Sequence, residues 1–122
     1  MLDILIVDDS AAIRKILQRV LRDAQIPVGK IFEASDGCEA LEVMKTQQIG
    51  LILSDINMPN MNGLELLGHL KAHDSWKHLP VVMVSTEGGQ GKVLEAVELG
   101  AAAYVRKPFN AEQIKDKLAV FF

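Results

Sequence analysis

The chain has 122 residues, of which 49% are hydrophobic and 24% are charged, and its formal net charge is −3. This length corresponds to a single domain over residues 1–122, and the composition is not that of a disordered chain. Because the charge is negative and no basic run occurs, nucleic acid is not expected as a partner. The apolar runs are far shorter than the roughly 20 residues of a membrane helix, so no membrane partner is expected either.

The N-terminal and cysteine patterns favour the cytoplasm. Asp3 and Asp8 stand where a secretory signal would have its apolar region. The single cysteine, Cys38, cannot form an internal disulfide, which suits a reducing compartment. We expect Cys38 to pack within the fold rather than to act as a nucleophile.

Five short apolar runs alternate with five longer amphipathic segments. The runs, which we predict to be strands, are residues 4–7, 30–34, 51–54, 81–84 and 102–105. Their aliphatic and β-branched residues suit strands that are covered on both sides. The alternation predicts an α/β fold of three layers, in which helices cover both faces of an open, doubly wound, five-stranded parallel sheet.

The first helix is predicted to follow Ser10, whose side chain can cap it. Its apolar residues recur at helical spacing and define one inward face, made of Ile13, Ile16, Leu17, Val20, Leu21 and Ala24. The basic residues fall elsewhere on this helix, and we expect all of them to be solvated: Arg14, Lys15, Arg19 and Arg22.

The second helix is predicted to follow Ser35 or Asp36, and the third to follow a turn-rich loop at residues 58–63. A glycine-rich loop at residues 88–91 precedes a short fourth helix around residues 93–99. The inward residues of the second and third helices are expected to be Ala40, Leu41, Met44, Leu64, Leu67 and Leu70.

Gly100 is expected to end the fourth helix, because glycine is favoured directly after a helix C-terminus. The last helix is predicted to begin at Asn110, with Gln113 at the spacing of a capping box. Its inward residues are expected to be Ile114, Leu118 and Phe121.

Polar residues follow the predicted strands at the points where the strands end. Open parallel sheets bind ligands beyond the carboxyl ends of their strands, so these residues are the candidates for a site. They are Asp8 and Asp9 after the first strand, Asp55 after the third, Ser85 and Thr86 after the fourth, and Arg106, Lys107 and Pro108 after the fifth.

The charges of these candidates predict a cation site. Two carboxylates about 5 Å apart repel by roughly 3 kcal/mol at an effective dielectric of about 20. Three acids and Lys107 leave a charge that a divalent ion would balance. Oxygen ligands without a nearby histidine or cysteine favour Mg²⁺, or alternatively Mn²⁺ or Ca²⁺, over zinc. A lysine and a hydroxyl beside them could hold a phosphoryl group, with a carboxylate as its nucleophile.

These residues resemble the motif set of response-regulator receiver domains, and among them the single-domain chemotaxis regulators. The resemblance extends over essentially the whole chain and implies a flavodoxin-like strand order of 2-1-3-4-5, which is known from that family. The residues that carry it are Asp8, Asp9, Asp55, Ser85, Lys107 and Pro108, together with segments 58–61, 63–67, 104–105 and 107–109.

The resemblance implies a metal site and a phosphorylation site. Asp55 would accept the phosphoryl group and ligate Mg²⁺. Asp9 would bind the ion directly, and Asp8 would bind it through water. The backbone carbonyl of Asn57 would complete the protein ligands.

It also implies roles for the residues around that site. Lys107 would pair with Asp55 and then with the phosphoryl oxygens, which Ser85 and Thr86 would also contact. Ser85 and Tyr104 would form a conformational switch. The peptide bond between Lys107 and Pro108 would be cis.

Two side chains beside the pocket, Asn57 and Glu87, would tune the lifetime of the acyl phosphate. The donor would be a histidine kinase. The target, a flagellar motor switch protein in the chemotaxis case, would bind the face made by the fourth helix, fifth strand and last helix, and a phosphatase is a further expected partner. We expect a monomer without an output domain. It would catalyse only its own phosphorylation and dephosphorylation and would not be a conventional enzyme.

Other classes fit less well. An aspartyl-phosphate hydrolase would need a second acid two residues after Asp55, where Asn57 stands. A flavin carrier would need a phosphate loop after the first strand, where Asp8 and Asp9 would repel phosphate. Within the receiver class, a phosphorelay intermediate or phosphate sink without a motor target remains an open alternative.

Two local patterns suggest other ligands. The glycine-rich segment 88–92 lacks the flanking residues of a P-loop, because Thr86 and Val93 occupy those positions. His69 and His73 have the spacing of a metal pair on one helix, but no third ligand is evident.

Overall fold

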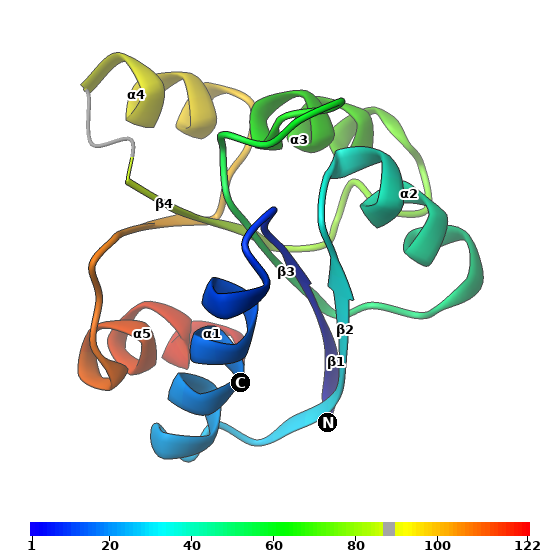
Figure 1. The fold of residues 1–122 in the computed structure, drawn as a ribbon. Helices are drawn as coiled ribbons and strands as arrows, with labels where there is room; N and C mark the ends of the chain where they lie inside the picture. Colours follow the sequence, from blue (N-terminus) through cyan, green and yellow to red (C-terminus); the bar gives the residue numbers. More distant parts are fainter. Residues whose placement is uncertain (87–89) are drawn as a thin grey trace.

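The computed structural model describes residues 1–86 and 90–122. In this part of the chain, five strands form one parallel sheet in the order β2-β1-β3-β4-β5. Five α-helices connect and cover these strands (Figure 1). The predicted fold class and strand order are confirmed.

The boundaries lie close to the predicted ones. The strands are β1 (Leu2–Val7), β2 (Val28–Ala34), β3 (Leu51–Ser54), β4 (Val81–Ser85) and β5 (Ala103–Arg106). The helices are α1 (Ala11–Asp23), α2 (Gly37–Thr46), α3 (Gly63–Ala72), α4 (Gln90–Glu98), α5 (Ala111–Leu118) and a short 3₁₀ turn, η1 (Ala119–Phe121). Strand β2 is longer than expected, since its first residues continue the parallel pairing with β1.

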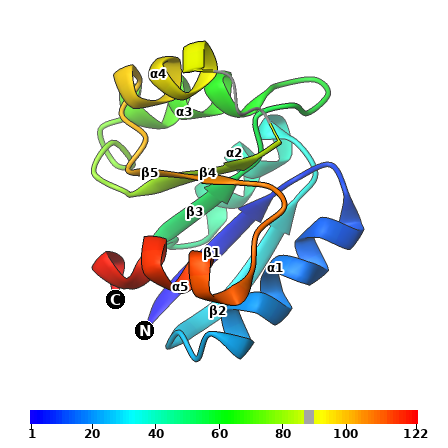
Figure 2. The ribbon, with the colours of Figure 1, turned by 90° about the vertical axis from the view of Figure 1, so that its left-hand side faces the viewer.

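Helices cover both faces of the sheet. Figures 1 and 2 show α1 and α5 together on one face and α2, α3 and α4 on the other. Strand β1 illustrates how the sequence builds both layers. Ile4 and Ile6 belong to the core beneath α1 and α5, whereas Leu5 and Val7 belong to the core on the opposite face. Alternate residues of a strand point to opposite faces, so a doubly covered strand must be apolar throughout.

Four helices begin at a side-chain cap. The capping side chains accept hydrogen bonds from backbone N–H groups in the first turn, and they belong to Ser10, Asp36, Asn62 and Asn110. The capping boxes of α3 and α5 are complete. Gly100 follows α4 with a φ of 100°, a left-handed conformation that glycine adopts readily. The predicted caps and the predicted end of α4 are therefore confirmed.

Helix α1 is rotated from its predicted orientation. Leu17 and Leu21 are its most buried residues, while Ile16, expected to face inward, is 47% exposed. Arg14, expected in solvent, lies three residues before Leu17 on the buried side, and its side chain is only 17% exposed. The apolar stripe of α1 is wider than the face that packs against the sheet. The periodicity alone therefore did not determine which of its residues face the core.

Cys38 is exposed on α2, so the prediction that it packs within the fold is wrong. It lies next to Gly37, at the start of the helix, where the buried face is formed by Gly37 and Ala40 instead. The inward positions of α3 were predicted correctly, and Leu66 is buried as well.

Gly63 allows a close approach between α3 and the end of β3. A Cβ atom at this position would lie 1.9 Å from the backbone oxygen of Asp55. We predict that Gly63→Ala destabilises the protein by about 1–3 kcal/mol, because the clash is with backbone that must shift.

Gly68→Ala is the matched control on the same helix, because a Cβ atom there meets nothing within 4 Å. This variant should be about 0.5–1 kcal/mol more stable than the wild type. Urea unfolding of the three proteins measures both differences. Equal effects of the two substitutions would contradict this account of Gly63.

Candidate functional site

Parallel pairing between β1 and β3 brings the acidic residues together. Val7 is paired with Ser54, the last residue of β3, so Asp8 and Asp55 follow the two strands side by side. The backbone N–H of Asp55 donates to the carbonyl of Val7 at 2.9 Å, which continues the pairing one residue further. The acids are therefore placed by the sheet itself rather than by a long loop.

The same pairing extends across the rest of the sheet. Ser54 is paired with Met83 in β4, and Ser85 is paired with Arg106 in β5. The backbone N–H of Lys107 then donates to the carbonyl of Ser85 at 2.9 Å. Residues 99 positions apart in the sequence, Asp8 and Lys107, consequently meet at one edge of the sheet.

The three carboxylates form a compact cluster. Asp8, Asp9 and Asp55 each offer an oxygen atom, and these atoms all lie within 4.8 Å of one another. Asp8 and Asp55 are buried, whereas Asp9 is exposed. The cluster is thus open on the side of Asp9, and its oxygen-only chemistry fits a hard divalent cation.

Lys107 provides the positive charge of the site. Its Nζ atom lies 2.7 Å from Asp8 Oδ2 and 3.6 Å from Asp55 Oδ2, and its side chain is 11% exposed. The resemblance led us to expect a pair with Asp55, and the shorter contact is with Asp8. Three carboxylates and one ammonium leave a formal charge of −2, which a single divalent ion would balance.

Local hydrogen bonds orient two of the acids. The backbone N–H of Ile56 donates to Asp55 Oδ1 at 2.7 Å. The backbone N–H of Ser10 donates to Asp8 Oδ1 at 2.9 Å. In both residues Oδ2 is the oxygen that faces Lys107, so the backbone contacts and the ion pairs use different oxygens.

The loop between Asp55 and α3 is tied to the start of α2. The side-chain amide of Asn60 donates to Asp36 Oδ2 at 2.8 Å, and the N–H of Gly37 donates to the carbonyl of Met61 at 3.1 Å. The pKa of Asp36 is lowered, chiefly because the backbone N–H of Glu39 donates to its carboxylate and secondarily because Asn60 does. Asn57, the expected source of a carbonyl ligand, belongs to this tethered loop.

The other predicted residues lie on β4 and β5 or follow these strands directly. Ser85 is fully buried at the end of β4, and Thr86 beside it is exposed. Tyr104 is half-buried and packs against the core beneath α2, α3 and α4. The Lys107–Pro108 peptide bond is cis.

Of the two residues predicted to tune the acyl-phosphate lifetime, the structure describes Asn57 but not Glu87. Asn57, two residues after Asp55, is exposed. Glu87 lies outside the described residues, as do residues 88–89 of the glycine-rich loop.

Three contributors were not predicted from the sequence: Arg14, the Asp36–Asn60 contact and the close approach at Gly63. Arg14 donates from Nη1 to the carbonyl of Asp8 at 2.6 Å. The sequence holds no local signal for this contact, because the spacing between Ser10 and Arg14 does not define how α1 is rotated against the sheet.

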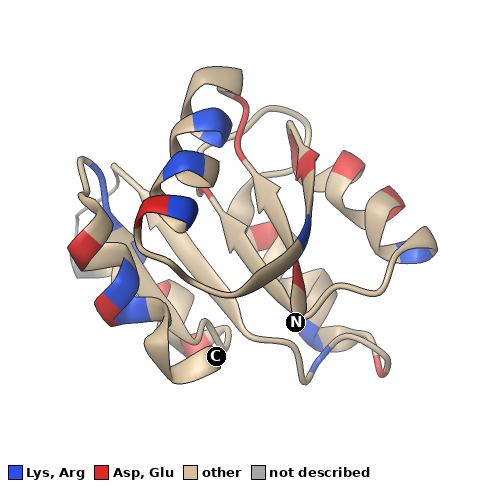
Figure 3. Ribbon diagram, turned by 90° about the horizontal axis from the view of Figure 1, so that it is seen from below, with Lys and Arg blue, Asp and Glu red and all other residues tan. Residues whose placement is uncertain are grey.

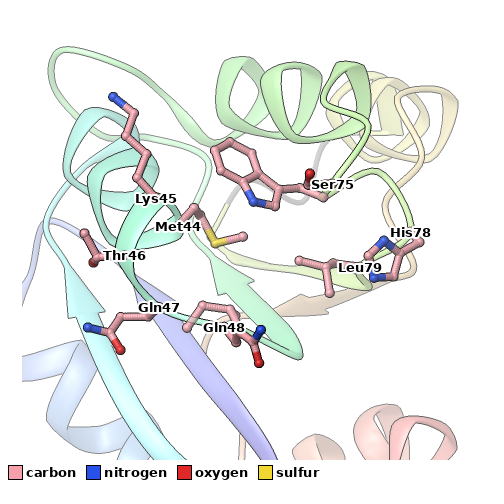
Figure 4. Close-up of a pocket in the computed structure, with 10 residues that line it drawn as sticks. Met44, Lys45, Thr46, Gln47, Gln48, Ser75, His78 and Leu79 are labelled. Atoms are coloured by element: carbon pink, nitrogen blue, oxygen red, sulfur yellow. The ribbon is translucent and has the colours of Figure 1, made fainter.

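A separate hollow lies at the amino-terminal ends of the strands, away from the acidic cluster at their carboxyl ends. It has a volume of about 480 Å³ and lies between the C-terminal end of α2 and the segment before β4 (Figure 4). Its lining includes Gln48 and Ile49 before β3 and Leu79 before β4. These residues precede the strands, whereas the acids follow them, so the hollow is not part of the acidic site.

His69 lies on α3, His73 directly follows this helix, and the two are not in a group of three or more potential metal ligands in the part of the chain that the structure describes. His73 stacks on Trp76, with ring centroids 3.8 Å apart. Within residues 1–86 and 90–122, the group of potential metal ligands is Asp8, Asp9 and Asp55. In the same ranges, no helix has the length and apolar character needed to cross a membrane.

Comparison with known proteins agrees with this site. Residues 4–119 match the family of response regulator receiver domains. The chemotaxis protein CheY-3 of Vibrio cholerae and the chemotaxis protein CheY of Pseudomonas aeruginosa are each 39% identical over 119 residues. This alignment covers 98% of this chain, 90% of the first relative and 94% of the second.

Solved structures give the same result. The chemotaxis response regulator CheY4 of Vibrio cholerae has a TM-score of 0.87 at 34% identity, with 100% of this chain and 99% of that chain covered. The chain therefore belongs to the response-regulator receiver domains of two-component signalling systems, and its relatives include the CheY proteins of chemotaxis.

The position of Lys107 generates a prediction about metal affinity. Lys107→Met should bind Mg²⁺ about 10-fold more tightly, because the substitution removes a competing cation from Asp8 and about 1.4 kcal/mol of charge repulsion. Titration calorimetry with MgCl₂ measures this change.

Lys117→Met is the control, since it removes the same charge from an exposed position on α5. Its Mg²⁺ affinity should stay close to that of the wild type. Unchanged or weaker binding by Lys107→Met would show that Lys107 does not compete for the acidic cluster.

Proposed function

We propose that Asp55 accepts a phosphoryl group from the phosphohistidine of a histidine kinase. The observation that carries this proposal is the meeting of Asp8, Asp9 and Asp55 with Lys107 at the carboxyl edge of the sheet. Carboxylates alone would repel a phosphate, whereas carboxylates with an ammonium and a divalent ion can hold one. Membership of the receiver family supports the same assignment.

Asp55 is better placed than Asp8 to act as the nucleophile. Asp8 Oδ2 is engaged by Lys107 at 2.7 Å, whereas Asp55 Oδ2 is 3.6 Å from the same atom and is therefore freer to attack. As the bond between this oxygen and phosphorus forms, the bond between phosphorus and the imidazole nitrogen breaks. The imidazole leaves with the electron pair and takes up a proton.

Mg²⁺ is the proposed cofactor, with Mn²⁺ as a substitute. Asp8, Asp9, Asp55 and the backbone carbonyl of Asn57 would hold it, since all are oxygen ligands. When bound, the ion would neutralise the charge that develops on the phosphoryl oxygens. The oxygen-only cluster of three carboxylates supports this choice of metal.

Lys107 and a hydroxyl are proposed to bind the transferred phosphoryl group. Lys107 is within reach of both buried acids and can exchange its contact with Asp8 for one with a phosphoryl oxygen. Ser85 is the last residue of β4, which is paired with β5, the strand that Lys107 follows, and Thr86 is the next residue after Ser85. Water would later hydrolyse the acyl phosphate, with Asn57 and Glu87 tuning the rate. The protein would thus catalyse only its own phosphorylation and dephosphorylation.

The signal is proposed to leave through the face made by α4, β5 and α5. β5 is an edge strand, and Tyr104 on it is paired with Met83, two residues before Ser85. A contact between the phosphoryl group and Ser85 can therefore change the packing of Tyr104. Leu94 and Val97 of α4, which are 56% and 57% exposed, offer apolar surface to a partner.

The names of the similar proteins support a role in chemotaxis. The proposed target is then a flagellar motor switch protein, the donor is a CheA-like kinase, and a phosphatase is a further partner. We propose a cytoplasmic monomer. The alternative is a phosphorelay intermediate or phosphate sink, whose binding to switch-complex proteins would be absent or indifferent to phosphorylation.

The phosphorylation itself is tested by intact-mass spectrometry after incubation with acetyl phosphate, with and without Mg²⁺. We expect one phosphoryl adduct that requires Mg²⁺ and is lost in Asp55→Asn, because the amide removes the nucleophilic oxygen. The matched control is Asp36→Asn, which alters another buried acid that is outside the cluster and leaves a side chain that can still cap α2. No adduct on the wild type, or an adduct that persists in Asp55→Asn, would contradict the proposal.

A further inference from the structure

Arg14 reaches back from α1 to the acidic loop. The connection between β1 and α1 consists of Asp8, Asp9 and Ser10, and Arg14 lies one turn into the helix. Its Nη1 atom donates to the backbone carbonyl of Asp8 at 2.6 Å, and its Nε atom donates to Glu33 Oε1 at 2.9 Å. The guanidinium therefore bridges the acidic loop and β2.

The carbonyl of Asp8 controls the orientation of Asp9. The carbonyl oxygen of one residue and the N–H and Cα of the next lie in one plane, because the peptide bond is planar. A hydrogen bond to the Asp8 carbonyl consequently fixes the plane from which Asp9 projects. Asp9 is the exposed member of the cluster, so it lacks the burial that restrains Asp8 and Asp55.

The contacts of Asp8 explain why this hydrogen bond has a separate effect. The N–H of Asp8 donates to the carbonyl of Ala34 at 3.1 Å, and the Asp8 carboxylate is held by Ser10 and Lys107. These contacts hold the N–H group and the side chain of Asp8. The carbonyl group of Asp8, which belongs to the peptide bond with Asp9, accepts a hydrogen bond from Arg14.

We propose that Arg14, braced by Glu33, is a positioning residue for the cation site: it holds the Asp8–Asp9 peptide so that the Asp9 carboxylate faces Asp55. The inference rests on the metal site of the proposed function. Arg14 does not ligate the ion and does not touch the phosphoryl group.

The sign of the effect separates positioning from simple charge. Arg14 is a cation beside a cation site, so electrostatics alone predicts that its removal strengthens Mg²⁺ binding. Loss of positioning predicts the opposite, since residues that orient metal ligands contribute about 10-fold or more to metal affinity. The direction of the change in affinity thus decides between the two.

Two substitutions at this position test the proposal. Arg14→Ala removes both contacts, whereas Arg14→Lys keeps the charge but loses the planar fork that reaches two partners at once. Arg19→Ala is the control. It removes the same charge from an exposed position further along α1, a helix with several basic residues (Figure 3).

Titration calorimetry with MgCl₂ is the measurement, and thermal unfolding without metal verifies that each variant is folded. We expect about 10-fold weaker binding by Arg14→Ala and a clear loss in Arg14→Lys. Arg19→Ala should bind as tightly as the wild type or slightly more tightly. The loss should persist at 0.5 M KCl, where interactions between exposed charges are screened.

Binding by Arg14→Ala that equals or exceeds that of the wild type would overturn the proposal, as would wild-type affinity in Arg14→Lys. A wild-type protein that binds no Mg²⁺ would contradict the proposed metal site itself and the inference with it. A failure of the inference alone is therefore distinguishable from a failure of the proposed function.

Discussion

Mutual repulsion among three carboxylates is the constraint on which the rest of the site depends. Asp8, Asp9 and Asp55 present oxygens within 4.8 Å of one another, two of the residues are buried, and Lys107 offsets only one of the three negative charges. Burying like charges is costly unless they are paired or bind a metal, so the fold must hold them in place. The result is a site with a formal charge of −2, which one divalent ion can balance.

The sheet is what holds this cluster. Because β1 lies between β2 and β3, the ends of β1 and β3 are adjacent, and the pairing of β3 with β4 and β4 with β5 brings Ser85 and Lys107 to the same edge. Strands that are apolar on both faces are rigid in this setting, since each is packed between two helical layers. Side chains that directly follow these strands, such as Asp8 and Asp55, are therefore held in fixed positions.

Much of this could be predicted from the sequence, because polar residues at strand ends are a local signal. Asp8 and Asp55 directly follow predicted strands, Lys107 lies two residues after another, and the parallel sheet then brings them together. The restraints around them depend on the tertiary structure and have no such signal. Whether Arg14 points to solvent or to the Asp8 carbonyl depends on the rotation of α1, which the wide apolar stripe did not define. The Asp36–Asn60 contact joins two loops 24 residues apart, which no periodicity relates.

The central claim is that one divalent ion binds between Asp9 and Asp55. It is tested most directly by anomalous diffraction from crystals soaked in MnCl₂, because Mn²⁺ substitutes for Mg²⁺ on oxygen ligands and scatters anomalously. The account predicts a single anomalous peak in contact with carboxylate oxygens of Asp9 and Asp55 and with the carbonyl of Asn57. A peak at another place, such as beside His69, or no peak at the acidic cluster would contradict it.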